Sequence, residues 1–206
     1  EAKNLAQEIV DLNDARKNMT KEGVDRAINI IDITDINNDN ILVVYIPDIH
    51  ESLAGIVAGR VKEKYNKPTI ILTKSEEGVK GSARSIEEYN MFEGLLACKE
   101  LLDKFGGHPM AAGLSLQEDK VDELRIALNN KCELTDEDLT RKIMIDSSLP
   151  LEYLNLHLIE ELNVLEPFGK GNAKPVFGVR DAKITRAMLL GKDKNVLKLK
   201  LLTNND

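Results

Sequence analysis

The sequence predicts an α/β fold, a mixed sheet flanked by helices, followed by a segment of partial β-barrel. Two continuous apolar runs, ILVVYI at 41–46 and PTIILT at 68–73, are typical of buried strands. Helical patterns alternate with strand patterns up to about residue 130, which favours a sheet of parallel or mixed sense. Beyond about residue 140 the strand signals are short and separated by turns, which is typical of a small barrel or sandwich.

The elements of the first part follow from hydrophobic spacing and from helix-stopping residues. Residues 1–21 place apolar side chains near heptad spacing and predict a helix, with a weaker continuation to about Ile31 that Gly23 limits. A helix is also expected over 90–105, where the glycine pair that follows would end it. The other expected elements are helices at 53–65 and 119–130 and strands at 79–83 and 110–116.

The polar run TDEDLT at 135–140 marks a change of character, and we place a domain boundary there. GKDKN at 191–195 is a hairpin turn signal between two strand patterns. The expected elements after the boundary are a helix at 151–162 and strands at 141–149, 175–179, 183–190 and 196–202. The predicted division is a connecting helix region at 1–36, an α/β domain at 37–138 and a partial barrel at 139–206.

Composition excludes several classes of protein. The chain has 206 residues, of which 42% are hydrophobic and 31% charged, so it can bury a core. No apolar run reaches the ~20 residues that a membrane span needs, and no signal segment opens the chain. The two cysteines, Cys98 and Cys132, are too few for a disulfide framework or a zinc site, which predicts a cytoplasmic protein. Aromatic residues make up only 4%, which argues against a surface of many base-stacking platforms.

Charge is distributed unevenly along the chain. The formal net charge is −7, yet residues 168–200 carry nine Lys and Arg against two Asp. A basic segment on an acidic chain indicates a local contact with nucleic acid. A solvated strand face would give the same charge pattern, and on charge alone both interpretations stay open. The candidate contacts are Lys170, Lys174, Lys183 and Arg186.

Three segments have residue types that suit phosphate binding. In GGHPMAAG (106–113), glycines would let backbone N–H groups approach a ligand and would project His108 from a helix-to-strand turn. In GSARS (81–85), an arginine fork and serine hydroxyls are donors that suit a phosphate. HESLAGIVAGR (50–60) opens a helix at which Ser52 is a natural N-cap. Read singly, each segment is better explained by a plain structure: a helix stop, a polar turn, and a packed and capped helix, respectively.

The sequence lacks the usual signs of a self-contained catalytic centre. His50, His108 and His157 lie far apart, and no carboxylate cluster with metal-ligand spacing accompanies them. No Walker loop, dinucleotide fingerprint or GxSxG elbow occurs. No metal ligands are therefore assigned in this chain.

Taken together and in this order, the three segments resemble the DHHA1 domain of the DHH phosphoesterase superfamily, whose hallmark is a Gly-Gly-His turn before a small-residue strand. Three longer stretches are similar to the RecJ family of bacterial single-stranded-DNA-specific exonucleases, and the likeness covers nearly the whole chain. These stretches are HESLAGIVAGRVKEKYNKPTIIL (50–72), KGSARSIEEYNMFEGLLACKELLDKFGGHPMAAG (80–113) and LEPFGKGNAKPVF (165–177).

The resemblance implies a DHHA1 domain at 37–138 and part of an OB-fold domain at 139–206. It implies a 5′→3′ exonuclease of recombination and repair, whose Mn²⁺ or Mg²⁺ is held by a DHH domain outside this chain. By similarity, Ser82 and Arg84 bind the 5′ phosphate, and Gly106, Gly107 and His108 lie against the scissile phosphate. The chain begins within a helical pattern and ends just after a strand pattern, so we expect a piece of a longer protein that has no metal and no activity by itself.

The partner that the resemblance implies is single-stranded DNA, with a single-strand-binding protein or a helicase as further partners of the full-length enzyme. Two alternatives remain open. One is another DHH–DHHA1 phosphodiesterase, of the short-oligonucleotide or pAp phosphatase type, which lacks the OB extension. The other is a nucleic-acid-binding module without chemistry.

Overall fold

The computed structural model describes residues 2–202, and the chain divides into two compact units between Arg141 and Lys142. The first unit is built on a five-stranded sheet in the order β1-β2-β3-β5-β4. Strands β1 and β2 are parallel, and every other neighbouring pair is antiparallel, so the predicted mixed α/β sheet is confirmed. The strands are β1 (Leu42–Tyr45), β2 (Thr69–Ser75), β3 (Gly78–Arg84), β4 (Lys104–His108) and β5 (Ala111–Leu116).

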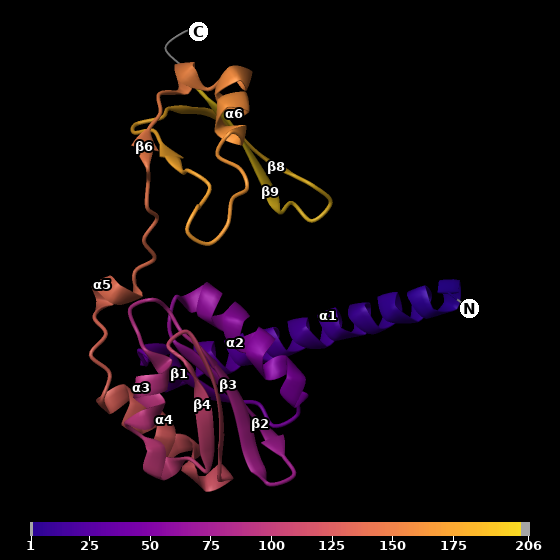
Figure 1. Cartoon of the computed structure of the whole chain (residues 1–206), viewed down its shortest axis with the longest axis vertical. Coiled ribbons are helices and arrows are strands. Elements are labelled where there is room, and N and C mark those ends of the chain that lie inside the picture. The colour runs from indigo at the N-terminus through magenta and orange to yellow at the C-terminus, as the bar shows by residue number, and fades with distance from the viewer. Residues whose placement is uncertain (1, 203–206) are drawn as a thin grey trace. The chain divides into compact units, whose positions relative to one another are not determined.

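Helices cover both faces of this sheet (Figure 1). Because alternate residues of a strand point to opposite faces, Ile70 and Leu72 enter one core and Ile71 the other. The first core includes α3 (Met91–Leu96) and α4 (Val121–Asn130), and the second includes α1 (Ala2–Ile33) and α2 (Glu51–Tyr65). On its face of the sheet, α2 packs against β2 and β3.

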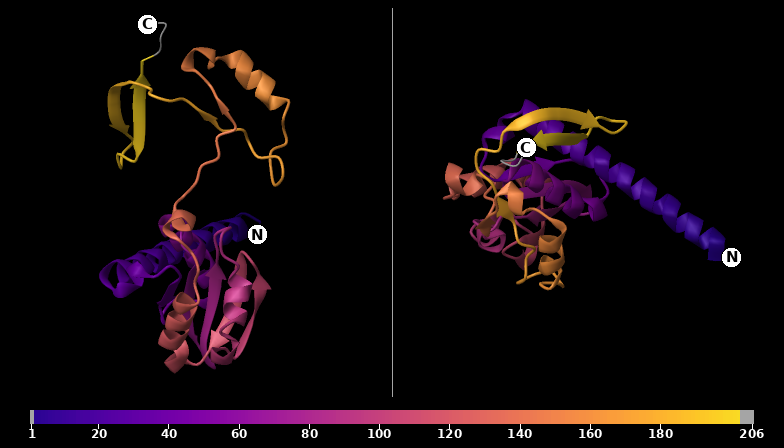
Figure 2. Two further views of the ribbon diagram at one scale, coloured as in Figure 1. Left: turned by 90° about the vertical axis from the view of Figure 1, so that its left-hand side faces the viewer. Right: turned by 90° about the horizontal axis from the view of Figure 1, so that it is seen from above.

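Helix α1 runs without a break from Ala2 to Ile33, so the expected continuation to about Ile31 is confirmed, whereas the limit expected at Gly23 is wrong. Gly23 is buried where α1 crosses α2, and a Cβ there would lie 3.1 Å from Val57 Cγ2. The glycine therefore permits a close helix contact. The N-terminal part of α1 is exposed and extends away from the rest of its unit (Figure 2).

The helix expected over 90–105 is wrong in its second half. Helix α3 ends at Leu96, a 3₁₀ turn follows at Lys99–Leu101, and the chain then enters β4. Leu101, Leu102 and Phe105 pack against the same core as α3, which explains why their spacing resembled one continuous helix. The backbone N–H of Asp103 already donates to Ser115 O at 2.8 Å, so pairing with β5 replaces helical bonding there.

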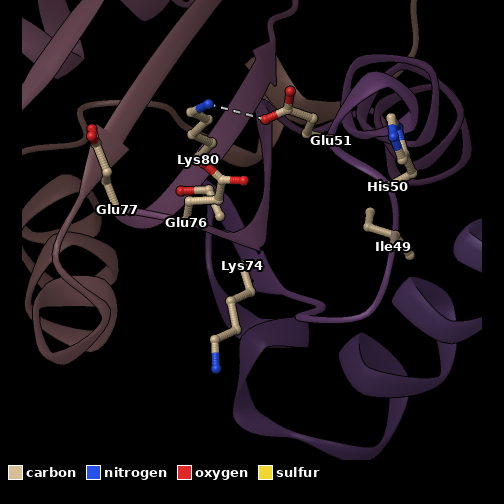
Figure 3. Close-up of a pocket in the computed structure, with 8 residues that line it drawn as sticks. Ile49, His50, Glu51, Lys74, Glu76, Glu77 and Lys80 are labelled. Atoms are coloured by element: carbon tan, nitrogen blue, oxygen red, sulfur yellow. Dashed lines mark hydrogen bonds and ion pairs between the residues drawn. The ribbon is translucent and has the colours of Figure 1, made fainter.

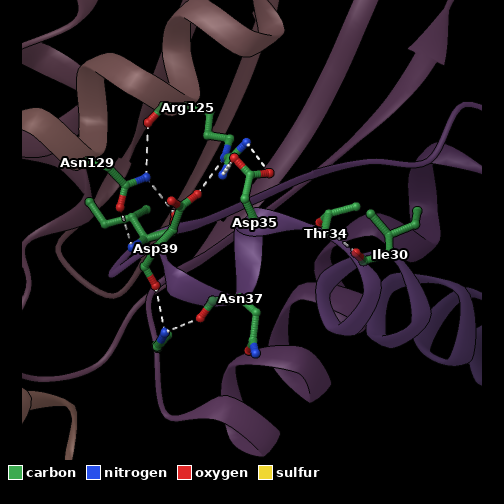
Figure 4. A network of polar contacts seen from close by, with 9 residues as sticks. Ile30, Thr34, Asp35, Asn37, Asp39, Arg125 and Asn129 are labelled. Carbon is green, nitrogen blue, oxygen red and sulfur yellow. Dashed lines mark hydrogen bonds and ion pairs between the residues drawn. The ribbon is translucent and has the colours of Figure 1, made fainter.

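A polar network fixes α4 to the segment before β1, which contains the 3₁₀ turn η1 (Asp35–Asn38) (Figure 4). Arg125 pairs with Asp39 at 2.5 Å (Nε–Oδ2) and with Asp35 at 3.1 Å (Nη2–Oδ2). The Asn129 amide bonds both the N–H and the carbonyl of Ile41, each at 2.9 Å. These contacts hold the edge strand β1 beside α4.

The second unit contains short pairings and one regular hairpin. Asp146 and Val176 bond reciprocally, at 2.9 Å between their main chains and 2.8 Å through the carboxylate, but only two residues on each strand then pair. The strands expected at 141–149 and 175–179 are therefore much shorter than predicted. Among the described residues of this unit none is fully buried. Its elements are β6 (Ser147–Ser148), η4 (Leu151–Tyr153), α6 (Leu156–Asn163), β7 (Phe177–Gly178), β8 (Ile184–Leu190) and β9 (Val196–Leu201).

Two smaller features complete the described chain. The polar run at 135–140 contains a one-turn helix, α5 (Asp136–Leu139), closed by a capping box between Thr135 and Asp138. No helix within residues 2–202 is both long and apolar enough to cross a membrane.

Candidate nucleic-acid interface

The register of three strands brings the predicted site residues together. Strand β5 lies between β3 and β4, so Ser82 pairs with Gly113, which pairs in turn with Gly106. Two residues further along each strand, Arg84 pairs with Ala111, and Ala111 pairs in turn with His108. Directly paired residues, and residues two apart on a strand, point to the same face. Ser82, Arg84, Gly106 and His108 therefore share one face of the sheet.

We call this face of β3, β5 and β4 the shelf. Helix α2 packs on the sheet as far as β3, and on β5 and β4 the residues facing the same way are exposed or half-buried. The shelf has three cationic side chains and one histidine, and none of its residues is acidic. Its residues are Lys80, Ser82, Arg84, Lys104, Gly106, His108, Ala111, Gly113 and Ser115.

Arg84 lies at the inner end of the shelf, against α2. Its Nη1 donates to the Ala83 carbonyl at 2.8 Å. Its Nη2 lies so close to Gly55 that a Cβ on that residue would be 2.8 Å away. Among the described residues no ion pair is formed by Arg84, which is half-buried, so its guanidinium is available to an anion.

The two glycines of the Gly-Gly-His motif face opposite sides of β4. Gly106 is on the shelf, and a Cβ there would meet nothing within 4 Å. Gly107 has φ +153° and pairs with the buried Ala112, where a Cβ would overlap the Ala111 carbonyl and lie 2.5 Å from Ala112 Cα. Both glycines were predicted as substrate contacts, and the geometry groups only Gly106 with the shelf.

His108 is the last residue of β4 and not part of a helix-to-strand turn, which corrects that expectation. The preceding helix had already ended at Leu96, so the motif forms an edge strand and its hairpin. The side chain of His108 is exposed on the shelf.

The first turn of α2 borders the shelf on the side of β3. His50 is the N-cap, accepting from Ser52 N at 3.2 Å through Nδ1, so the assignment of Ser52 as N-cap is wrong by two residues. The Glu51 carboxylate forms an ion pair with Lys80 Nζ at 3.2 Å, and Figure 3 shows these two side chains facing each other. A cavity of about 340 Å³ lies between this turn and the shelf, and Ser52, Lys80 and Ser82 are among its lining residues.

Sequence reasoning did not select Lys80 or Lys104 as site residues. Lys80 precedes Ser82 and Arg84 at two-residue intervals, so strand alternation was the signal that would have found it. Lys104 could be found only with the register, because it pairs with Ser115, which in turn pairs with Lys80.

The described residues hold no group of three or more His, Cys, Asp or Glu side chains that could bind a metal ion. Apart from His108, the polar side chains on the shelf are cationic or hydroxylic, which suits a phosphate better than a divalent cation. No chemical step assigned to this chain is therefore routed through a metal.

The second unit has a basic face on the hairpin of β8 and β9. Arg186 lies opposite Lys200, and Met188 lies opposite Lys198, so the three cations share one face of the hairpin. Lys198 and Lys200 were missing from the predicted contacts, although their alternation with leucine is a strand signal. Lys183 directly precedes β8, whereas Lys170 and Lys174 lie in the loop before β7. The structure therefore joins only part of the predicted set.

Comparisons with known proteins agree with this architecture. The family model described as the DHHA1 domain matches residues 38–134, and that of the RecJ OB domain matches residues 145–206. The single-stranded-DNA-specific exonuclease RecJ of Bacillus subtilis is 36% identical over 203 residues, covering 97% of this chain and 26% of that protein. The same-named protein of Haemophilus influenzae is 33% identical and covers 97% of this chain and 36% of its own length.

Solved structures give the same result. The crystal structure of RecJ with Mg²⁺ from Thermus thermophilus matches with a TM-score of 0.82 and 26% identity, over 97% of this chain and 31% of that one. The Mn²⁺ complex from the same organism matches with a TM-score of 0.74, at 25% identity and over 98% and 31% of the two chains. The chain thus spans between about a quarter and about a third of the length of these relatives and solved structures. With a DHHA1 domain followed by a RecJ OB domain, it belongs to the RecJ family.

Proposed function

We propose that this chain holds single-stranded DNA for a 5′→3′ exonuclease, with the 5′ end on the shelf. The observation that carries the proposal is the register that aligns Ser82 and Arg84 with Gly106 and His108 on an open, cationic face. Phosphate contacts dominate the affinity of proteins for nucleic acids, and such a face supplies the donors.

In this proposal Ser82 and Arg84 bind the terminal 5′ phosphate. The guanidinium offers a planar pair of donors to phosphate oxygens, and the serine hydroxyl adds a third. Helix α2 lies immediately behind Arg84, because Gly55 approaches its Nη2. The DNA strand therefore starts at α2 and runs over β5 toward the exposed edge strand β4.

His108 is proposed to contact the phosphate that reacts. Strand β5 lies between β3 and β4, so the backbones of β3 and β4 are about 10 Å apart. The long side chain of Arg84 can span part of this distance. The exposed imidazole of His108 can donate to a non-bridging oxygen and stabilise negative charge as it develops. Gly106 leaves the surface beside it open to the backbone of the DNA.

The basic face of the β8–β9 hairpin is proposed to follow the DNA backbone in the manner of an OB-fold groove. In the same proposal, residues 1–36, 37–138 and 139–206 are the connecting helix region, the DHHA1 domain and the OB-fold segment. The match to a RecJ OB domain argues against the short-oligonucleotide phosphodiesterase alternative, which has no such extension.

The remaining parts of the proposal concern the full-length protein. The RecJ structures from Thermus thermophilus are complexes with Mg²⁺ or Mn²⁺, and we propose that a DHH domain outside this chain supplies such a site. We further propose a role in recombination and repair in the cytoplasm, with a single-strand-binding protein or a helicase as partners. This chain by itself should then bind DNA without hydrolysing it, even in the presence of Mn²⁺.

Equilibrium binding of this chain to two labelled single-stranded oligonucleotides, alike except for a 5′ phosphate or a 5′ hydroxyl, tests the proposal. We expect tighter binding of the phosphorylated end, and loss of that difference in Arg84→Ala. Arg60→Ala is the control, because Arg60 is an exposed arginine on α2 that pairs with Glu63. Equal affinity for both ends in the wild type, or metal-dependent release of nucleotides by this chain alone, would contradict the proposal.

A further inference from the structure

Helix α2 approaches the shelf closely at Gly55, which lies against Arg84. A Cβ on Gly55 would be 2.8 Å from Arg84 Nη2, 3.5 Å from Arg84 Cζ and 3.4 Å from Ser82 Oγ. The three atoms nearest to that position all belong to the proposed phosphate-binding pair, Ser82 and Arg84. An added methyl group would displace the guanidinium, because Arg84 Nη2 is the one atom of the three that would lie closer than ordinary contact distance allows.

The position of the guanidinium is therefore set from two sides. Its Nη1 is bonded to the Ala83 carbonyl at 2.8 Å, and its Nη2 lies against the bare backbone of α2 at Gly55. Among the described residues no carboxylate pairs with Arg84 and could draw its guanidinium to another position. A side chain with many rotamers loses less entropy on binding when its position is fixed beforehand.

We propose that Gly55 is a positioning residue that sets the preference for a 5′-phosphorylated end by keeping Arg84 in its binding position. This inference rests on the proposed function of the shelf. Gly55 touches no DNA in this account and acts only through Arg84. The specificity of the end-binding site thus depends on a helix residue that has no functional group.

The chain provides a matched control one turn along the same helix. Gly59 is half-buried like Gly55, but a Cβ at Gly59 would meet nothing within 4 Å. Both changes to alanine raise helix propensity by a similar amount, roughly 1 kcal/mol. Any difference between Gly55→Ala and Gly59→Ala therefore reports the contact with Arg84 and not the helix.

The experiment uses the full-length protein and measures kcat/KM on 5′-phosphate and 5′-hydroxyl single-stranded oligonucleotides, with melting curves beside it. Gly55→Ala should lower the ratio between the two substrates at least about fivefold, a part of what a charge-assisted bond provides. Gly59→Ala should leave the ratio unchanged. Both variants should melt at or above the wild-type temperature, because the only clash at Gly55 is with the end of a flexible side chain.

A double-mutant cycle separates this inference from the proposed function. In the Arg84→Ala background, Gly55→Ala should have no further effect on the ratio. An undiminished effect there, or equal losses in the Gly55 and Gly59 variants, would overturn the inference alone. A wild-type ratio in Gly55→Ala would do the same. If Arg84→Ala itself keeps the wild-type ratio, the proposed function of the shelf fails as well.

Discussion

Gly106 and Gly107 are neighbours in sequence, but their missing side chains have different consequences. At Gly107 the positive φ and the adjacent Ala111 and Ala112 backbone exclude a Cβ, so this glycine is needed for the β4–β5 hairpin. At Gly106 a Cβ would meet open space on the shelf. One glycine therefore maintains the fold and the other leaves room for a ligand.

Substitution of each glycine by alanine should separate these effects. Gly107→Ala should lower the free energy of unfolding by about 1–3 kcal/mol, because backbone strain and a steric clash coincide there. Gly106→Ala should melt close to the wild-type temperature and yet weaken binding of single-stranded DNA, since its methyl group projects from the shelf. Thermal melts together with oligonucleotide titrations measure both effects. Wild-type stability of Gly107→Ala would show that this account of the hairpin is wrong.

At the residue scale, the sequence predicted which residues belong to the shelf better than it predicted how they are arranged. Ser82, Arg84 and His108 could be selected because few residue types suit a phosphate. Their common face depends on β5 lying between β3 and β4, and no local pattern encodes that order. The separate orientation of Gly107 was unpredictable for the same reason.

At the scale of elements, the network at Arg125 holds α4 against the edge of the sheet. The Arg125 side chain is 20% exposed and its partner Asp39 is 17% exposed, whereas Asp35 is 78% exposed. The partly buried pair with Asp39 should therefore contribute more than the exposed pair with Asp35. The hydrogen bond from Arg125 is the main cause that lowers the pKa of Asp35 below its ordinary value of 3.8.

Arg125→Ala should lower the free energy of unfolding by about 2–3 kcal/mol at neutral pH, because it leaves the Asp39 carboxylate without its charged donor. A carboxyl group with a lowered pKa stabilises the fold above its unfolded-state pKa and loses that effect as the pH falls through its folded-state pKa. The difference from the wild type should therefore shrink below about pH 4. Urea unfolding across pH measures it.

Lys120→Ala is the control for that series, because Lys120 and its partner Glu123 are both exposed, so the loss of their ion pair should change the free energy of unfolding much less than Arg125→Ala does. Equal losses of stability in the Arg125 and Lys120 variants would contradict the assigned role of the network.

The elements that the sequence predicted well are those whose hydrophobic pattern is typical of only one kind of secondary structure. The buried strands β1 and β2 and the helix α2 lie within a few residues of their predicted ranges. The segment 90–105 was mispredicted because helix, turn and strand all bury side chains in one core. Periodicity reports burial, and it cannot show where backbone bonding passes from the helix to a neighbouring strand.

At the scale of the whole molecule, an acidic protein carries two surfaces on which strand pairing gathers cationic side chains, the shelf and the β8–β9 hairpin. Each surface is defined within its own unit by strand pairing. The net charge of −7 therefore says little about binding, whereas the local arrangement favours a phosphate backbone.

Salt dependence tests the hairpin contribution. Replacing both Lys198 and Lys200 with glutamine should reduce the slope of log affinity against log salt concentration by about 1.4, since each phosphate contact on a single strand contributes about 0.7. Replacing the exposed Lys3 and Lys21 of α1 with glutamine is a control of equal charge. Titration of this chain with an unstructured oligonucleotide at several salt concentrations gives the slopes. An unchanged slope would indicate that the two lysines only face solvent.

The measurement that tests the central claim most directly is the steady-state kinetics of Arg84→Ala and His108→Ala in the full-length protein on 5′-phosphate and 5′-hydroxyl single-stranded DNA. Arg84→Ala should mainly weaken binding of the phosphorylated substrate, by roughly 1.5–3 kcal/mol, and should narrow the preference for it. His108→Ala should mainly lower kcat, on the order of 10²–10³-fold, because its contact strengthens in the transition state. Melting curves should show both variants folded. An intact end preference in Arg84→Ala, or wild-type turnover in His108→Ala, would contradict the assignment of the shelf as the site that holds the reacting end of the DNA.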